Sequence, residues 1–123
     1  MKGTKLETGK AILAFSQSEK IKEGIIWTSN TLGMLDGLHE SEKKGAEKVI
    51  QTLINMIGQE IKLAQVVSGM KEWDDVEPHI DKALLMMNSG VGREAVEHLS
   101  KALSMVTTIG QRAMSVLKDK ELI

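Results

Sequence analysis

Apolar residues recur at steps of three and four along nearly the whole chain, and alternation at every second residue is almost absent. Steps of three and four place side chains on one face of an α-helix, whereas alternation is typical of a half-buried strand. The chain also has a single proline and no Asn-Gly or Asp-Gly turn between alternating runs. We therefore expect an all-α protein, with residues 1–123 in one domain of common size.

The periodicity predicts four helices, over about residues 6–38, 41–70, 75–88 and 93–118. Their connections are short, which favours an antiparallel four-helix bundle. The third helix is shorter than the others, so parts of its neighbours would stay uncovered in a monomer. We therefore expect the chain to pair as a homodimer or to pack on another helical protein.

Each long helix has an expected buried face. In the first helix it consists of Ala11, Ala14, Ser18, Ile21, Ile25, Thr28, Leu32 and Leu35, and a break near residues 28–30 stays open because several glycines weaken this helix. In the second it consists of Ala46, Val49, Ile50, Leu53, Ile57, Ile61, Ala64 and Val67. In the fourth it consists of Val96, Leu99, Leu103, Val106, Gly110, Ala113 and Leu117.

Several residues are typical of helix ends. Ser41 is the expected N-cap of the second helix, and Gly69 suits its C-cap region. Asp74 and Glu77 have the spacing of a capping box that would begin the third helix. Pro78 would then fall in the first turn of that helix, where proline is tolerated.

The composition excludes several classes of function. The chain has no cysteine, which removes disulfides, thiolate nucleophiles and cysteine-bound metals. Its formal net charge is −1 and only 2% of its residues are aromatic, so we do not expect it to bind nucleic acid. It shows neither a signal-peptide pattern nor a membrane span, and we expect a cytoplasmic protein without a cofactor.

Arg93 and His98 are the candidate catalytic residues. The run Arg93-Glu94-Ala95-Val96-Glu97-His98 resembles the Arg-x4-His motif of HEPN-type ribonucleases, which are small helical proteins that often dimerise. The resemblance covers six residues and implies that Arg93 and His98 act on RNA. The chain departs from the motif at Glu94, where that family usually has Asn, Asp or His. On a regular helix the two side chains would lie about 140° apart.

Two histidines occupy equivalent places in a short internal repeat. Residues 79–87 and 98–106 align without gaps and are identical at five of nine positions, including His79 and His98. One interpretation is a shared core pattern of two amphipathic helices. The alternative is a metal site in which His79 and His98 act with Met86 or Met105, because imidazole and thioether ligands suit copper or haem iron.

The eight methionines are the strongest functional clue in the sequence. Methionine adapts to irregular surfaces, and several of these residues, Met56 among them, lie beside the expected buried faces. We expect a non-enzymatic protein that works as an adaptor or assembly subunit through apolar helix faces. The residues expected to form its interaction face are Met86, Ala95, Ala102, Met105 and Ile109.

Overall fold

A computed structural model describes residues 6–123 of the chain. This part of the protein contains four α-helices, one short 3-10 helix and no strand. The α-helices are α1 (Thr8–Leu32), α2 (Glu40–Ser68), α3 (Trp73–Asn88) and α4 (Gly92–Asp119), and the 3-10 helix is η1 (Leu35–Gly37). The all-helical prediction with a shorter third helix is therefore confirmed.

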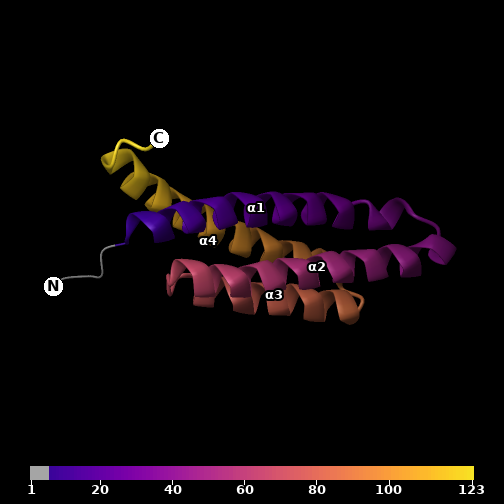
Figure 1. Cartoon of the computed structure of the whole chain (residues 1–123). Helices are drawn as coiled ribbons and strands as arrows, with labels where there is room; N and C mark the ends of the chain where they lie inside the picture. Colours follow the sequence, from indigo (N-terminus) through magenta and orange to yellow (C-terminus); the bar gives the residue numbers. More distant parts are fainter. Residues whose placement is uncertain (1–5) are drawn as a thin grey trace.

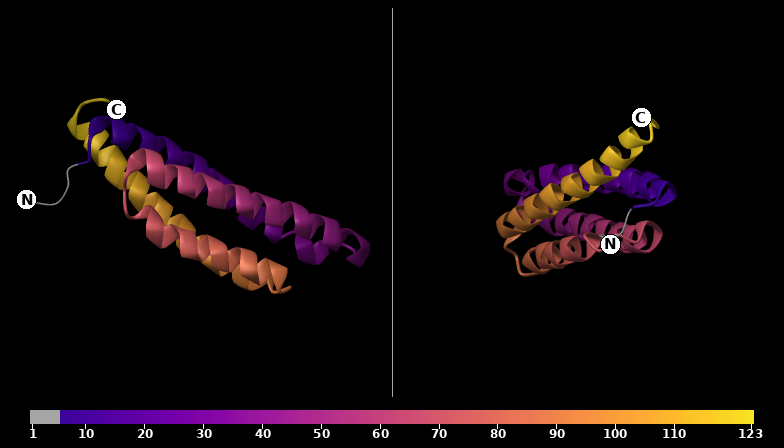
Figure 2. Two further views of the ribbon diagram at one scale, coloured as in Figure 1. Left: turned by 60° about the horizontal axis from the view of Figure 1, so that its bottom comes forward. Right: turned by 90° about the vertical axis from the view of Figure 1, so that its left-hand side faces the viewer.

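The four helices pack around one core, as in a bundle. Helix α1 contacts α2 and α4, and α3 contacts the same two helices, which closes the ring. Figure 1 shows the chain turning back at each connection, and Figure 2 shows α4 crossing the other helices at an angle. The core is formed by aliphatic side chains from all four helices and by Trp73.

The buried face of the N-terminal segment matches the sequence prediction at every position from Ala11 to Leu35. The predicted extent of the helix is wrong, however. Helix α1 is continuous through residues 28–30 and ends at Leu32, not near residue 38. Gly33 follows as its C-cap, and η1 then brings Leu35 back to the core. Glycine is a poor helix former and weakens the α-helix at this point.

The buried face of α2 differs in part from the prediction. Ile54 is fully buried, whereas Val49 is 59% exposed. Val49 lies about 100° from its neighbour Ile50 around the helix, so both cannot occupy the centre of the buried face. Leu53 is half-buried at the margin of that face.

The start of α2 also differs from the prediction. His39, not Ser41, is the N-cap, and the Glu42 carboxylate accepts a hydrogen bond from the His39 backbone N–H at 3.2 Å. At the other end Gly69 is the C-cap with φ of 65°, as predicted. This left-handed conformation favours glycine because it has no Cβ.

The start of α3 corrects a second cap prediction. Helix α3 begins at Trp73 after Glu72, so Asp74 lies inside the first turn and forms no capping box with Glu77. Pro78 consequently lies beyond the first turn of the helix. The side chain of Trp73 is fully buried and so fixes the start of α3 against the core.

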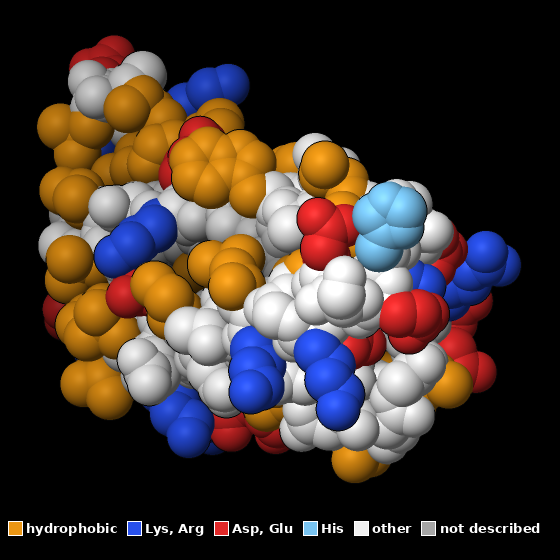
Figure 3. Space-filling view, turned by 90° about the vertical axis from the view of Figure 1, so that its right-hand side faces the viewer, with side chains coloured by type: hydrophobic (Ala, Val, Ile, Leu, Met, Phe, Trp, Pro, Cys, Tyr) orange, Lys and Arg blue, Asp and Glu red, His pale blue; other side chains and the backbone are white. Residues whose placement is uncertain are grey.

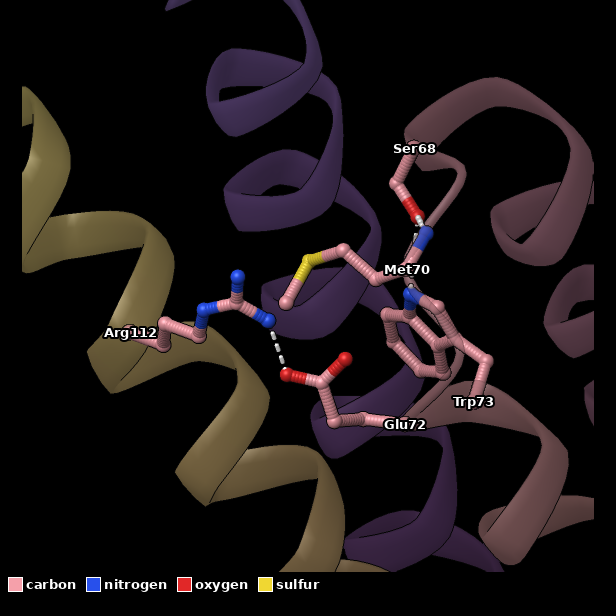
Figure 4. A network of polar contacts seen from close by, with 5 residues as sticks. All are labelled: Ser68, Met70, Glu72, Trp73 and Arg112. Carbon is pink, nitrogen blue, oxygen red and sulfur yellow. Dashed lines mark hydrogen bonds and ion pairs between the residues drawn. The ribbon is translucent and has the colours of Figure 1, made fainter. Parts of the chain in front are cut away.

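Ser68 organises the connection between α2 and α3 (Figure 4). Its hydroxyl donates to the Ala64 carbonyl oxygen at 2.6 Å and accepts from the Trp73 indole Nε1–H at 3.0 Å. It also accepts from the Met70 backbone N–H at 3.3 Å. One buried hydroxyl therefore satisfies three polar groups where the chain reverses.

Candidate interaction surface

Arg93 and His98 have different neighbours in the structure. Arg93 lies in the first turn of α4, where its Nη2 is 3.3 Å from Oδ2 of Asp36 at the solvent-exposed end of the bundle. His98 is half-buried against α3. Both residues belong to the regular helix α4, so the separation of about 140° expected from the sequence applies to them. The structure thus does not assemble the ribonuclease-like pair within one chain.

His79 and His98, in contrast, come together between α3 and α4. Their rings are stacked, with centroids 5.9 Å apart and an interplanar angle of 28°. The Nδ1 atom of each ring is buried and has no hydrogen-bond partner. Burial lowers the pKa of His79, and the nearby His98, Lys82 and Lys101 lower it further. The two equivalent positions of the internal repeat therefore meet as a ring-to-ring contact.

The two histidines lack a third metal ligand of the usual kind nearby. Within residues 6–123, no group of three or more His, Asp or Glu side chains is arranged to hold a metal ion. The Nδ1 atoms are also enclosed by the packing of α3 on α4. What the structure shows at this place is a contact between the two histidine rings of α3 and α4.

The interaction face expected from the sequence is largely used inside the bundle. Ala95, Ala102 and Ile109 are buried in the core, where α4 packs on its neighbours. Met86 and Met105 are half-buried and pack against the same core. Three of the five residues thus have no surface to offer to a partner.

An open cleft of about 620 Å³ lies at the end of the bundle, between η1, the start of α2 and the turn before α4. Its wall carries Lys43 and Arg93 as well as Asp36, Glu47 and Glu94. Charges of both signs are therefore mixed around it. The cleft presents no single electrostatic preference that would select an anion or a cation.

An exposed apolar feature lies where α1 meets α2. Glu60 of α2 contacts α1 directly, because its Oε1 atom is 3.0 Å from Lys20 Nζ and accepts from Gln17 Nε2 at 3.2 Å. These hydrogen bonds from Lys20 and Gln17 lower the pKa of Glu60. The contact defines which edge of each helix borders the other.

Five large apolar side chains flank this contact, and we call them the outer α1–α2 face. Along each helix, the members are separated from Lys20 or Glu60, or from one another, by three, four or seven residues. Such separations place side chains on the same edge of a helix. Each is 44–65% exposed. The members are Leu13 and Trp27 of α1 and Val49, Met56 and Leu63 of α2.

The surface of the molecule is divided accordingly. Figure 3 looks onto the end where α1 leads into α2 and shows hydrophobic side chains gathered along one flank. Polar and charged side chains cover most of the opposite flank in this view. Exposed apolar side chains gathered on one side of a protein commonly mark a site of interaction with another protein.

Sequence reasoning found one member of this face and missed the others. Met56 is exposed, in line with its place beside the main apolar face of α2. The available signal was a step of seven residues, from Leu13 to Trp27 through Lys20 and from Val49 through Met56 to Leu63. Such steps are typical of helices that pack on further helices.

The fold and this face define the chain as an all-helical protein with four packed helices and an exposed apolar surface. No family model matches the chain, and comparisons with curated proteins and with solved structures found no match. None of the helices between residues 6 and 123 combines the length and the apolar character needed to cross a membrane.

Proposed function

We propose that the protein is a non-enzymatic interaction protein, an adaptor or assembly subunit, that binds another helical surface through its outer α1–α2 face. The observation that carries this proposal is the exposure of five large apolar side chains along neighbouring edges of one helix pair. Removing such side chains from water is the main favourable term in protein association.

The kinds of residue on the face also support this role. Trp27 is 65% exposed, and tryptophan is among the residues that contribute most to binding energy at interfaces. Met56 adds a flexible side chain that adapts to the shape of a partner. The heptad steps on both helices suit a partner that presents helices of its own.

The proposal includes an antiparallel order of the helices. On α1 and α2, Gln17 contacts Glu60, and the position of a Cβ on Gly24 would meet Ile57. Residue numbers therefore rise along α1 as they fall along α2. The connections between successive helices are all short, which supports the same order around the bundle.

Site-specific photo-crosslinking in cells that express the protein tests this function. A benzophenone amino acid at Trp27 is expected to give discrete protein adducts on irradiation. The same group at Ser104, an exposed position on α4, serves as the matched control and should give none. Adding Met56→Lys to the Trp27 probe should abolish the adducts. Equal labelling from both positions, or no adduct from either, would contradict the proposal.

A further inference from the structure

We infer that the occupant of the outer α1–α2 face is a second copy of this chain, related to the first by a two-fold axis that passes close to Lys20 and Glu60. This inference rests on the proposed function and specifies its partner. It is carried by the spacing of the apolar side chains, by the charges between them and by the area that they offer.

The apolar residues of the face form two groups on either side of the Lys20–Glu60 contact. Trp27 follows Lys20 by seven residues and Leu13 precedes it by seven, so each lies about 10 Å from Lys20 along α1. Because α1 and α2 run in opposite directions at this contact, Met56 lies on the Trp27 side and Leu63 on the Leu13 side.

A two-fold axis can pair these side chains between two copies of the chain. Rotation by 180° about an axis that lies in the plane of the face, between α1 and α2 and parallel to them, places α1 of one copy over α2 of the second copy. It brings Trp27 of one copy onto Met56 of the second copy and Leu13 onto Leu63, and both contacts form a second time by symmetry. The bulky Trp27 side chain then packs against the flexible Met56 side chain at one end of the face, and the two leucines pack together at the other end.

The charges at the centre of the face are complementary under the same rotation. A single charge near a two-fold axis would face its own copy, which is repulsive. This face carries one cation and one anion there, and Lys20 is 61% and Glu60 31% exposed. Lys20 of each copy can therefore reach Glu60 of the second copy. The Glu60 carboxylate is charged at neutral pH, and the hydrogen bonds from Lys20 and Gln17 move its pKa further below that range.

The area of the face also suits a dimer of this size. Five large side chains, each about half exposed, present on the order of 500 Å² of apolar surface. A standard interface buries about 800 Å² on each partner, of which a little more than half is non-polar, or about 450 Å². The apolar surface on one copy thus corresponds to the non-polar share of a stable interface.

Sedimentation equilibrium of the purified full chain tests the inference. We expect a mass of about 27 kDa, twice the 13.5 kDa of one chain. Trp27→Glu and Met56→Lys are each expected to weaken the dimer by roughly thirtyfold or more. Leu85→Glu is the matched control, because Leu85 is a similarly exposed apolar residue on α3, and it should leave the dimer unchanged. Circular dichroism checks that each variant keeps its helices.

A charge-exchange experiment tests the position of the axis. The Lys20→Glu chain carries two carboxylates at the centre of the face, and the Glu60→Lys chain carries two ammonium groups. Each chain alone should be monomeric, and an equimolar mixture should form a heterodimer. A mixture that stays monomeric while the unaltered chain dimerises would overturn the proposed axis.

The outcomes separate this inference from the proposed function. If the unaltered chain is monomeric at all concentrations, the second copy is not the occupant. Adducts from Trp27 to a different protein would then leave the proposed function standing. A dimer that resists Trp27→Glu and Met56→Lys, or that Leu85→Glu disrupts equally, would also overturn the inference.

Discussion

Ser18 of α1 and Gly110 of α4 bring their two helices into close contact. A Cβ atom added at Gly110 would lie 2.6 Å from Ser18 Oγ and 3.3 Å from Ser18 Cβ, both closer than normal contacts. Ser18 is buried, and its hydroxyl donates to the Phe15 carbonyl oxygen at 2.8 Å. The absence of a side chain at Gly110 therefore sets how closely α4 approaches α1.

Gly110→Ala should destabilise the protein in spite of the higher helix propensity of alanine. The added methyl group forces Ser18 or the helix backbone to move, and overpacking of this kind costs about 1–3 kcal/mol. Urea unfolding followed by circular dichroism measures the change in the free energy of unfolding.

Gly45→Ala is the matched control for this prediction. Gly45 lies in α2, and no atom lies within 4 Å of the position of its Cβ. The substitution should therefore stabilise the protein by about 0.5–1 kcal/mol, as expected for glycine in a helix interior. Ser18→Ala should recover part of the loss in the Gly110→Ala background. A stabilising Gly110→Ala would show that the two helices do not pack as closely as described.

Ser68→Ala should be more damaging than its small size suggests. The substitution leaves the buried Trp73 indole N–H and the Met70 backbone N–H without their acceptor. An unsatisfied buried donor costs about 1–3 kcal/mol. The same urea titration measures the loss, and the intrinsic fluorescence of Trp73 should change with it.

Thr52→Ala provides the comparison within the same helix. The Thr52 hydroxyl also donates to a carbonyl four residues earlier, that of Lys48, but it is exposed and serves no second group. Its removal should change the stability by less than about 0.5 kcal/mol. In the Trp73→Phe background, which lacks the indole N–H, Ser68→Ala should cost less than in the unaltered chain. If the two losses simply add, the hydrogen bond between Ser68 and Trp73 carries no energy.

The stacked histidines predict a pH dependence of stability. Burial lowers the pKa of His79 in the folded chain, with further lowering from His98, Lys82 and Lys101. The folded state thus binds fewer protons than the unfolded state, where the pKa is about 6.5. The contribution of neutral His79 to the free energy of unfolding is therefore complete above about pH 6.5. This contribution is lost as the pH falls from there through the lowered pKa of His79.

The difference between the unaltered chain and a His79→Gln variant isolates this effect. Urea titrations between about pH 5 and pH 8 cover the window set by the unperturbed pKa of histidine. We expect the free energy of unfolding of the unaltered chain to fall more steeply below pH 6.5 than that of the variant. Parallel curves would show that His79 titrates alike in the folded and unfolded chains.

The sequence alone was sufficient to identify the buried residues of a helix where one face is clearly more apolar than the rest. On α1 every residue expected to be buried is buried, including the polar Ser18 and Thr28, because the step of three and four leaves one continuous face. Gly69 was likewise identifiable as a helix end, because a left-handed C-cap favours glycine.

Sequence patterns for helix ends gave the wrong start of a helix where a tertiary contact contributes more free energy than the cap. Asp74 and Glu77 have the spacing of a capping box, yet α3 begins at Trp73, whose side chain is buried and bonded to Ser68. Burying a tryptophan contributes more free energy than a capping hydrogen bond. The spacing of residues along the chain does not show that Trp73 has a hydrogen-bond partner on another helix.

The outer α1–α2 face also depends partly on the sequence and partly on the tertiary structure. The sequence determined that the protein is helical and that it has more apolar helix surface than one core requires. It did not determine which of these apolar side chains remain exposed. Ala95, Ala102 and Ile109 are buried, whereas Trp27 and Val49 are exposed. Only tertiary packing decides this, because α2 is apolar over more than one face and the positions of its neighbours α1 and α3 select the face that they cover.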